Sequence, residues 1–191
     1  MDDENIDIED YPTLLQVGRF ARLIPHTNWF RNVGEPLSPA IRQKARAYLD
    51  ALGFPGADIA QILDWDEAAA TMETNDWNSP WWEAEEQLLA GLAMSAQEML
   101  DPDALRVALT HVNTQASEYI TEALLTTADL WGIHDDELIR AAAGTAIHSC
   151  YQAALMIAAG EEEDHPFALK FQLFEEGWWP LGVVGNTFNI F

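Results

Sequence analysis

Basic residues and cysteine are scarce in this chain. Its 191 residues include nine Lys and Arg against 32 Asp and Glu, and Cys150 is the single cysteine. A lone cysteine cannot form an intramolecular disulfide, and the apolar sequence around Cys150 favours a buried thiol. The first ten residues contain six acidic and no basic residues, unlike a secretory or organelle-targeting presequence. We therefore expect a cytoplasmic protein in a reducing compartment.

The acidic charge is unevenly distributed. Residues 1–46 contain seven acidic and six basic residues, whereas residues 47–191 contain 25 acidic and three basic residues, a balance of −22. Nucleic-acid binding requires clustered Lys and Arg that neutralise phosphates, so the composition disfavours direct binding to DNA or RNA. A negative field attracts basic proteins, although it also simply keeps a protein soluble. A basic protein is thus the expected partner, and solubility is the alternative explanation of the charge.

One long stretch of the chain has almost no charge. Between Leu138 and Ala159 the only charged residue is Arg140, in a protein whose formal net charge is −23. The stretch is long enough to cross a membrane, but it is rich in alanine and acidic residues flank both of its ends, where basic anchors would be expected. It therefore predicts the buried central helix of a helical fold, with no membrane span.

Cap and turn signals divide the rest of the chain into helices. Ser or Asp followed by Pro predicts helix starts at positions 38, 79 and 101, and Asp135 is predicted to cap the central helix. The predicted helices span about 39–52, 80–100, 102–130, 136–159 and 166–176, with a short helix near 57–63 and one or two turns across 66–72. Short connections between helices of this length favour a bundle.

The C-terminal residues, about 180–191, predict a hairpin. Two five-residue arms flank Gly185-Asn186, a dipeptide suited to a two-residue turn. An uninterrupted register from this turn places four apolar side chains on one face, as the pairs Val183 with Phe188 and Leu181 with Ile190. A lone hairpin is marginally stable in water, so this face is expected to pack on the helices.

The predicted fold class is therefore mainly α: a single-domain helical bundle of four to six helices with a small C-terminal β-hairpin packed on it. Residues 1–12 are predicted to form an acidic flexible tail, and residues 13–191 are predicted to form the helical domain.

No catalytic or cofactor-binding motif stands out. The chain contains no His-Glu-x-x-His, no phosphate-binding glycine loop and no paired cysteines. Ser38 and Ser79 lie at helix starts, where a serine caps the helix. We therefore expect a protein without a cofactor that is not an enzyme.

A polar stripe on the central helix is the first candidate site. Four uncharged polar residues have spacings that gather them on one face: Thr145, His148, Ser149 and Gln152. Buried polar side chains need hydrogen-bond partners. The stripe either lines a pocket for a small polar ligand or closes a helix contact, and the structural alternative is the simpler of the two because a lone histidine lacks a positioned nucleophile.

A metal site is an alternative for the helix that starts at residue 102. His111, Glu118 and Glu122 lie beside its apolar seam, and together with His148 they carry the donor types of a metal centre. A dimetal carboxylate bundle requires two Glu-x-x-His motifs, whereas this chain has one, Glu162 to His165, in an acidic linker. Charged residues beside a seam are typical of a solvated helix flank, which is the competing interpretation.

Tryptophans form the third candidate site. Five of them gather near one loop and near the root of the hairpin: Trp77, Trp81, Trp82, Trp178 and Trp179. Such rings are enriched in protein-binding surfaces, although they are equally typical of the core at the end of a bundle.

Two functions are left open by these observations. The first is a non-enzymatic, acidic helical protein that binds another protein as an adaptor, immunity-like or regulatory protein, and the tryptophans and the charge favour it. The alternative is a small-molecule or metal-dependent site inside the bundle. A homodimer through the helix faces is compatible with both, although the net charge opposes it at low salt.

Overall fold

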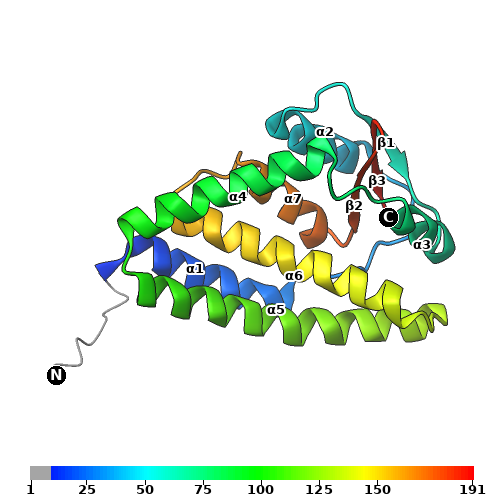
Figure 1. Cartoon of the computed structure of the whole chain (residues 1–191). Helices are drawn as coiled ribbons and strands as arrows, with labels where there is room; N and C mark the ends of the chain where they lie inside the picture. The colour runs from blue at the N-terminus through cyan, green and yellow to red at the C-terminus, as the bar shows by residue number, and fades with distance from the viewer. Residues whose placement is uncertain (1–9) are drawn as a thin grey trace.

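The helices form an elongated bundle with a small sheet at one end (Figure 1). The computed structural model describes residues 10–191, so most of the predicted tail at 1–12 lies outside the described residues. Within that range the elements are α1 (Pro12–Leu23), the 3-10 helix η2 (Ile24–His26), α2 (Pro39–Leu52), β1 (Asp58–Gln61), α3 (Trp65–Glu73), α4 (Pro80–Met99), α5 (Pro102–Trp131), α6 (Asp136–Ala158), α7 (Pro166–Glu175), β2 (Pro180–Val184) and β3 (Thr187–Ile190). The predicted fold class, mainly α with a small C-terminal β element, is confirmed.

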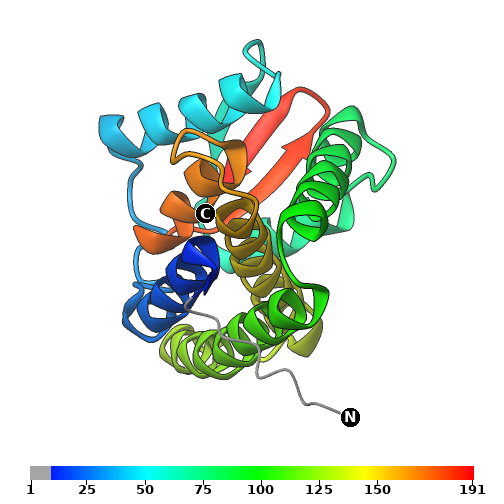
Figure 2. The same cartoon turned by 90° about the vertical axis from the view of Figure 1, so that its left-hand side faces the viewer.

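Helix α6 is the central helix of the molecule. It packs against α1, α4, α5 and α7, and a view turned by 90° from Figure 1 shows it between them (Figure 2). Its exposed residues are the two acidic residues of its first turn, Arg140 and Gly144. The predicted buried central helix is therefore confirmed. No helix within residues 10–191 combines the length and the apolar character that a membrane span requires.

The helix starts lie where the cap signals predicted them. Four predicted cap side chains accept hydrogen bonds from backbone N–H groups of the following turn: Ser38, Ser79, Asp101 and Asp135. Helix α1, by contrast, was not predicted, although its buried residues Leu14, Val17, Phe20 and Ala21 have helical spacing. The one or two turns predicted across 66–72 form the complete helix α3.

The prediction of a short helix near residues 57–63 is wrong. This segment contains strand β1, which pairs in parallel with β3, so that the strand order in the sheet is β1-β3-β2. Ile59 lies opposite Phe188 in this pairing. The strand depends on a partner about 130 residues further along the chain, and local sequence patterns carry no signal for such a partner.

The predicted hairpin exists, but its register changes at Leu181. Val184 pairs with Thr187 on either side of the predicted two-residue turn. A β-bulge between Pro180 and Gly182 then places Pro180, rather than Leu181, opposite Ile190. The predicted pair of Leu181 with Ile190 is therefore wrong, because the bulge moves Leu181 to the other side of the sheet, against the main core.

The protein has two adjoining hydrophobic cores, one around α6 and one against the sheet. The main core surrounds α6 and includes Trp179 and Phe191. The second core lies between α2, α7 and the hairpin and includes Tyr48, Leu173 and Phe188. The hairpin contributes to both cores, since Phe188 and Ile190 lie in the second core while Leu181 and Phe191 lie in the main core, so it joins the bundle to the α2 layer.

We predict that removing residues 187–191 prevents stable folding. The deletion removes the middle strand and the fully buried side chains of Phe188, Ile190 and Phe191. The loss of large buried side chains costs about 2–5 kcal/mol each, and a typical domain has only about 5–15 kcal/mol of stability. Thermal unfolding followed by circular dichroism should show no cooperative transition. The control is Asn186→Gly at the exposed turn; an unchanged melting temperature after the deletion would contradict the prediction.

Candidate functional site

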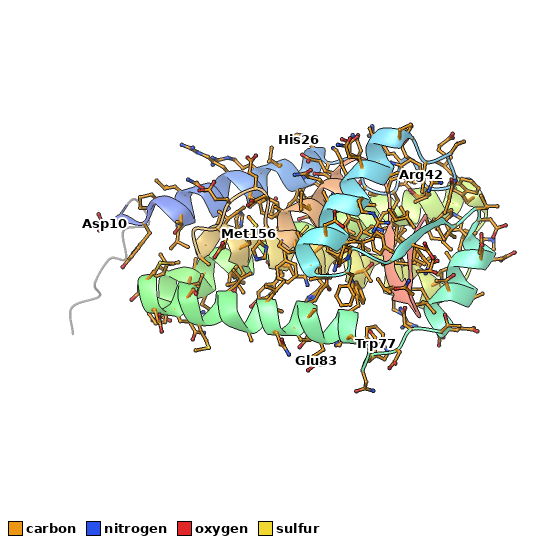
Figure 3. The ribbon with its side chains drawn as sticks, turned by 90° about the horizontal axis from the view of Figure 1, so that it is seen from above. Asp10, His26, Arg42, Trp77, Glu83 and Met156 are labelled. Carbon is orange, nitrogen blue, oxygen red and sulfur yellow. The ribbon has the colours of Figure 1, made fainter. Side chains whose placement is uncertain are left out.

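A pocket of about 410 Å³ opens where α4, α6, α7 and β2 meet the loop that joins α3 to α4. Apolar atoms form most of its lining. The lining residues are Met72, Asn75, Asp76, Trp77, Trp81, Trp82, Glu86, Ala141, Gly144, Thr145, His148, Lys170, Pro180, Leu181 and Val183. Figure 3 shows the labelled Trp77 at the edge of the molecule, on the loop that leads into α4.

This pocket brings together residues from two of the predicted sites. Thr145 and His148 belong to the polar stripe of α6, and Trp77, Trp81 and Trp82 belong to the tryptophan group. Loop residues and the first turns of α4 carry the tryptophans to the polar face of α6. Two sites that the sequence analysis treated as separate therefore form one cavity.

A buried ion pair borders the pocket. Lys170 Nζ donates hydrogen bonds to both carboxylate oxygens of Glu85, at 2.9 and 3.0 Å, and to Gln152 Oε1 at 3.3 Å. The hydroxyl of Tyr48 donates to the same carboxylate at 2.6 Å. Glu85 is 2% exposed and Lys170 is 7% exposed. The group links α2, α4, α6 and α7 through one residue from each helix.

The pairing explains how two charges lie inside the protein. A buried carboxylate or ammonium group is costly unless it has an opposite charge and further hydrogen bonds, and here both groups have them. Burial, together with the Glu85 carboxylate, raises the pKa of Tyr48 well above its ordinary value of 10.0. The Tyr48 hydroxyl therefore stays protonated and remains a donor to Glu85.

Trp81 lines the pocket beside this ion pair. Its indole N–H donates to the Tyr48 hydroxyl at 2.9 Å, and Lys170 Nζ lies 5.6 Å from the centre of its ring. A Cβ atom at Gly182 would lie 2.8 Å from the Trp81 ring, so glycine is needed beside it. The bulged start of β2 thus fixes the position of the tryptophan.

The other two tryptophans lie on the solvent side. The rings of Trp77 and Trp82 meet edge to face, with centroids 4.8 Å apart and an angle of 86°. Trp77 is 57% exposed, whereas Trp82 is partly buried. An indole with this much exposed surface can still bury apolar area against a ligand.

His148 is partly buried in the pocket wall and forms no side-chain hydrogen bond within residues 10–191. Its ring stacks near Tyr151, with centroids 6.4 Å apart. Burial lowers the pKa of His148, and Lys170 lowers it further, against the opposite effect of Glu85 and Glu86. The imidazole is therefore neutral near pH 7 and offers one acceptor nitrogen to a ligand.

The other residues of the polar stripe, Thr145, Ser149 and Gln152, face groups inside the protein. Thr145 Oγ1 donates to the Ala142 carbonyl and accepts from Trp179 Nε1, both at 2.9 Å. Gln152 Oε1 accepts a hydrogen bond from Lys170 Nζ. The Ser149 hydroxyl is buried and has no hydrogen-bond partner among the described residues. The stripe thus both lines a pocket and closes helix contacts, which the sequence analysis had treated as alternatives.

Trp178 and Trp179 are core residues, and the prediction that they contribute to a protein-binding surface is wrong for these two. They are 4% and 0% exposed. Trp179 packs against Phe30 and Trp65, and Thr145 satisfies its indole N–H. Their burial follows from the connection between α7 and β2, which runs between the two cores.

The residues of the alternative metal site lie apart. His111, Glu118 and Glu122 face three different surface depressions, and His148 lines the tryptophan pocket. Among residues 10–191, no three His, Cys, Asp or Glu side chains come close enough together to hold a metal ion. Glu118 and Glu122 are neighbours one turn apart, but His111 lies about two turns from Glu118, so the three cannot converge without donors from facing helices.

The sequence analysis missed Tyr48, Glu85 and Lys170. One signal for Lys170 was present, because it is one of only two lysines and interrupts the apolar run of α7. A charge in such a run needs a partner. Nothing in the sequence identifies that partner as Glu85, which is 85 positions away.

No protein-family model, curated protein or solved structure matches this chain at a significant level. The function of the pocket therefore has to follow from the chemistry of its lining residues.

We predict that Lys170→Met lowers the free energy of unfolding by about 3–5 kcal/mol, because it leaves the Glu85 carboxylate buried without its counter-charge. Urea unfolding measures this loss. The double variant Glu85→Leu with Lys170→Met should lose less than the sum of the single variants. The matched control is Arg106→Ala in the exposed pair with Asp103, where we expect about 1 kcal/mol or less. Equal effects at both positions would contradict the assigned role.

We predict that His148 titrates below its ordinary pKa of 6.5 in the folded protein, as followed by its imidazole signal in NMR spectra. His148→Gln identifies the signal. Because the pKa is higher in the unfolded chain, protonation favours unfolding, so the contribution of the neutral ring is lost as the pH falls below about 6.5. His148→Gln should therefore lose less stability over this range than the unaltered protein. A midpoint at or above 6.5 would contradict the burial of the ring.

Proposed function

We propose that this protein is a non-enzymatic binding protein whose tryptophan pocket holds a small apolar or aromatic ligand. The observation that carries the proposal is the union of Trp77, Trp81 and Trp82 with Thr145 and His148 around one cavity of about 410 Å³. Ligand pockets are typically of this size, mostly apolar, with a few converging polar groups. The small-molecule alternative of the sequence analysis thus gains support over the protein-binding alternative.

The side chains around the pocket favour binding over catalysis. His148 has no hydrogen-bonded nucleophile and no second base beside it within the described part of the chain. Lys170 Nζ is engaged by both Glu85 carboxylate oxygens and by Gln152 Oε1, so it is not placed as a free nucleophile in the pocket. Burial raises the pKa of Cys150, which is fully buried on α6, so its thiol is not activated.

A protein partner is the second candidate function. Trp77 is 57% exposed, and the region of residues 47–191 has a balance of −22, which favours a basic partner over nucleic acid. A side chain of such a partner would enter the same pocket. We also propose a cytoplasmic location, which the lone buried Cys150 favours. A homodimer is a further proposal.

We predict that Gly144→Leu abolishes ligand binding without destabilising the fold. Gly144 lines the pocket on α6, and a Cβ added there meets no atom within 4 Å. A leucine would therefore fill the cavity, and replacing a helical glycine stabilises the helix by up to about 1 kcal/mol. Saturation-transfer NMR with indole and 2-phenylethanol measures binding, which we expect at about millimolar affinity for such small probes.

The control for this experiment is Gly91→Leu. Gly91 is an exposed helical glycine on α4 whose added Cβ also meets no atom within 4 Å, and it lies outside the pocket. The unaltered protein and Gly91→Leu should bind the probes, and Gly144→Leu should not. Equal binding by the two glycine variants, or no binding by the unaltered protein, would refute the proposed site. A basic partner that co-purifies with Gly91→Leu but is lost from Gly144→Leu would favour the second candidate function.

A further inference from the structure

Among residues 10–191, the one Lys or Arg that lines the pocket has no free hydrogen-bond donor. Lys170 carries three N–H groups, and three acceptor oxygens lie within hydrogen-bond distance of Nζ: the two of Glu85 and the one of Gln152. The Glu85 charge also balances the Lys170 charge. An anionic ligand would therefore find neither net positive charge nor a charged donor at this wall.

Two of the first three backbone N–H groups of the helix N-terminus beside the pocket are also occupied. Among the first backbone N–H groups of α4, that of Trp82 donates to Ser79 Oγ at 3.3 Å and that of Glu83 donates to the Ser79 carbonyl at 3.0 Å. Within the described part of the chain, an anion at the start of α4 would find one free backbone N–H, that of Trp81, and would have to displace these bonds to gain a second. The side-chain donors that remain there, among them the indole N–H groups of Trp77 and Trp82 and one N–H of Asn75, are uncharged.

Apart from the paired Lys170, the charged groups of the pocket lining within residues 10–191 are carboxylates. Glu86 and Asp76 are exposed carboxylates in its lining, and the Glu86 carboxylate makes no hydrogen bond within the described residues. His148 is neutral near pH 7 because burial lowers its pKa, so it offers one acceptor nitrogen and one N–H donor but no charge. These three groups provide two negative charges and one neutral imidazole around an apolar interior.

The aromatic walls also favour positive charge. An indole ring attracts a cation over its face, and Trp81 already has the Lys170 ammonium group 5.6 Å from its ring centre. Trp77 and Trp82 add two further rings at the solvent side of the same cavity. Apolar walls, indole faces and rim carboxylates together are complementary to an apolar group that carries an ammonium ion.

We propose that the ligand of this pocket is a protonated amine with an aromatic or branched apolar body. The body lies among Trp77, Trp81 and Trp82, and the ammonium group lies toward Glu86 and Asp76 at the rim. This inference rests on the proposed binding function and adds the charge and chemical class of the ligand.

The experiment uses three probes of matched shape: 2-phenylethylamine, 2-phenylethanol and 3-phenylpropionate. Isothermal titration with the full chain at pH 7 and low salt should give about tenfold tighter binding of the amine than of the alcohol, with the carboxylate weakest. Salt should reduce the advantage of the amine and leave the alcohol unchanged, because salt screens the charges at the exposed rim.

Glu86→Gln tests the acceptor at the rim, and Glu98→Gln is its matched control. Both residues are exposed on α4 and both changes remove one negative charge, but only Glu86 lines the pocket. Glu86→Gln should bring the affinity for the amine close to that for the alcohol, whereas Glu98→Gln should keep most of the difference.

The outcomes separate the two proposals. Equal or tighter binding of the alcohol or the carboxylate would overturn the inference about charge and would leave the pocket as a binding site. An amine preference that Glu98→Gln reduces as much as Glu86→Gln would also overturn it, since the general charge of the protein would then be the cause. Failure of all three probes to bind, or binding that persists in Gly144→Leu, would overturn the proposed function itself.

Discussion

The buried ion pair of Glu85 with Lys170 is the interaction on which this arrangement depends. It joins α4 to α7, and through Tyr48 and Gln152 it also holds α2 and α6. Charges inside a protein constrain geometry strongly, because any separation leaves a costly unpaired group. The four helices that meet at this pair are also those around the tryptophan pocket or directly behind it. The position of the pocket wall is therefore set by electrostatics as much as by apolar packing.

The same pair decides the character of the pocket. Because Glu85 neutralises Lys170 and occupies its donors, the pocket contains a lysine without being cationic. The Tyr48 hydroxyl then receives the Trp81 indole N–H, and Gly182 gives the Trp81 ring room on its other side. The remaining charge lies with Glu86 and Asp76 at the rim, and the neutral His148 lies in the pocket wall. The presence of Lys170 alone would suggest a site for an anionic ligand. Its hydrogen-bond partners instead favour an amine as the ligand.

Local signals predicted much of the fold. The helix caps at Ser38, Ser79, Asp101 and Asp135 depend on hydrogen bonds within one turn, so the sequence predicts them. The apolar run of α6 likewise predicted that this helix is buried. Strand β1 was misassigned because its partner β3 lies about 130 positions away. The Leu181 bulge was missed because a one-residue register change has no regular pattern. For the site, Thr145, His148 and the tryptophans of the α4 region were identified, but as members of separate sites.

The sequence by itself determined the helical class, the buried central helix, the hairpin turn and the strongly acidic surface, because each follows from composition or from contacts between near neighbours. The tertiary structure alone decided which polar groups are paired. It placed Glu85 within 2.9 Å of Lys170, buried Trp178 and Trp179, and brought Trp77 to the same cavity as His148. These pairings depend on how helices far apart in the chain pack together. A charged side chain can be buried only when its oppositely charged partner lies beside it.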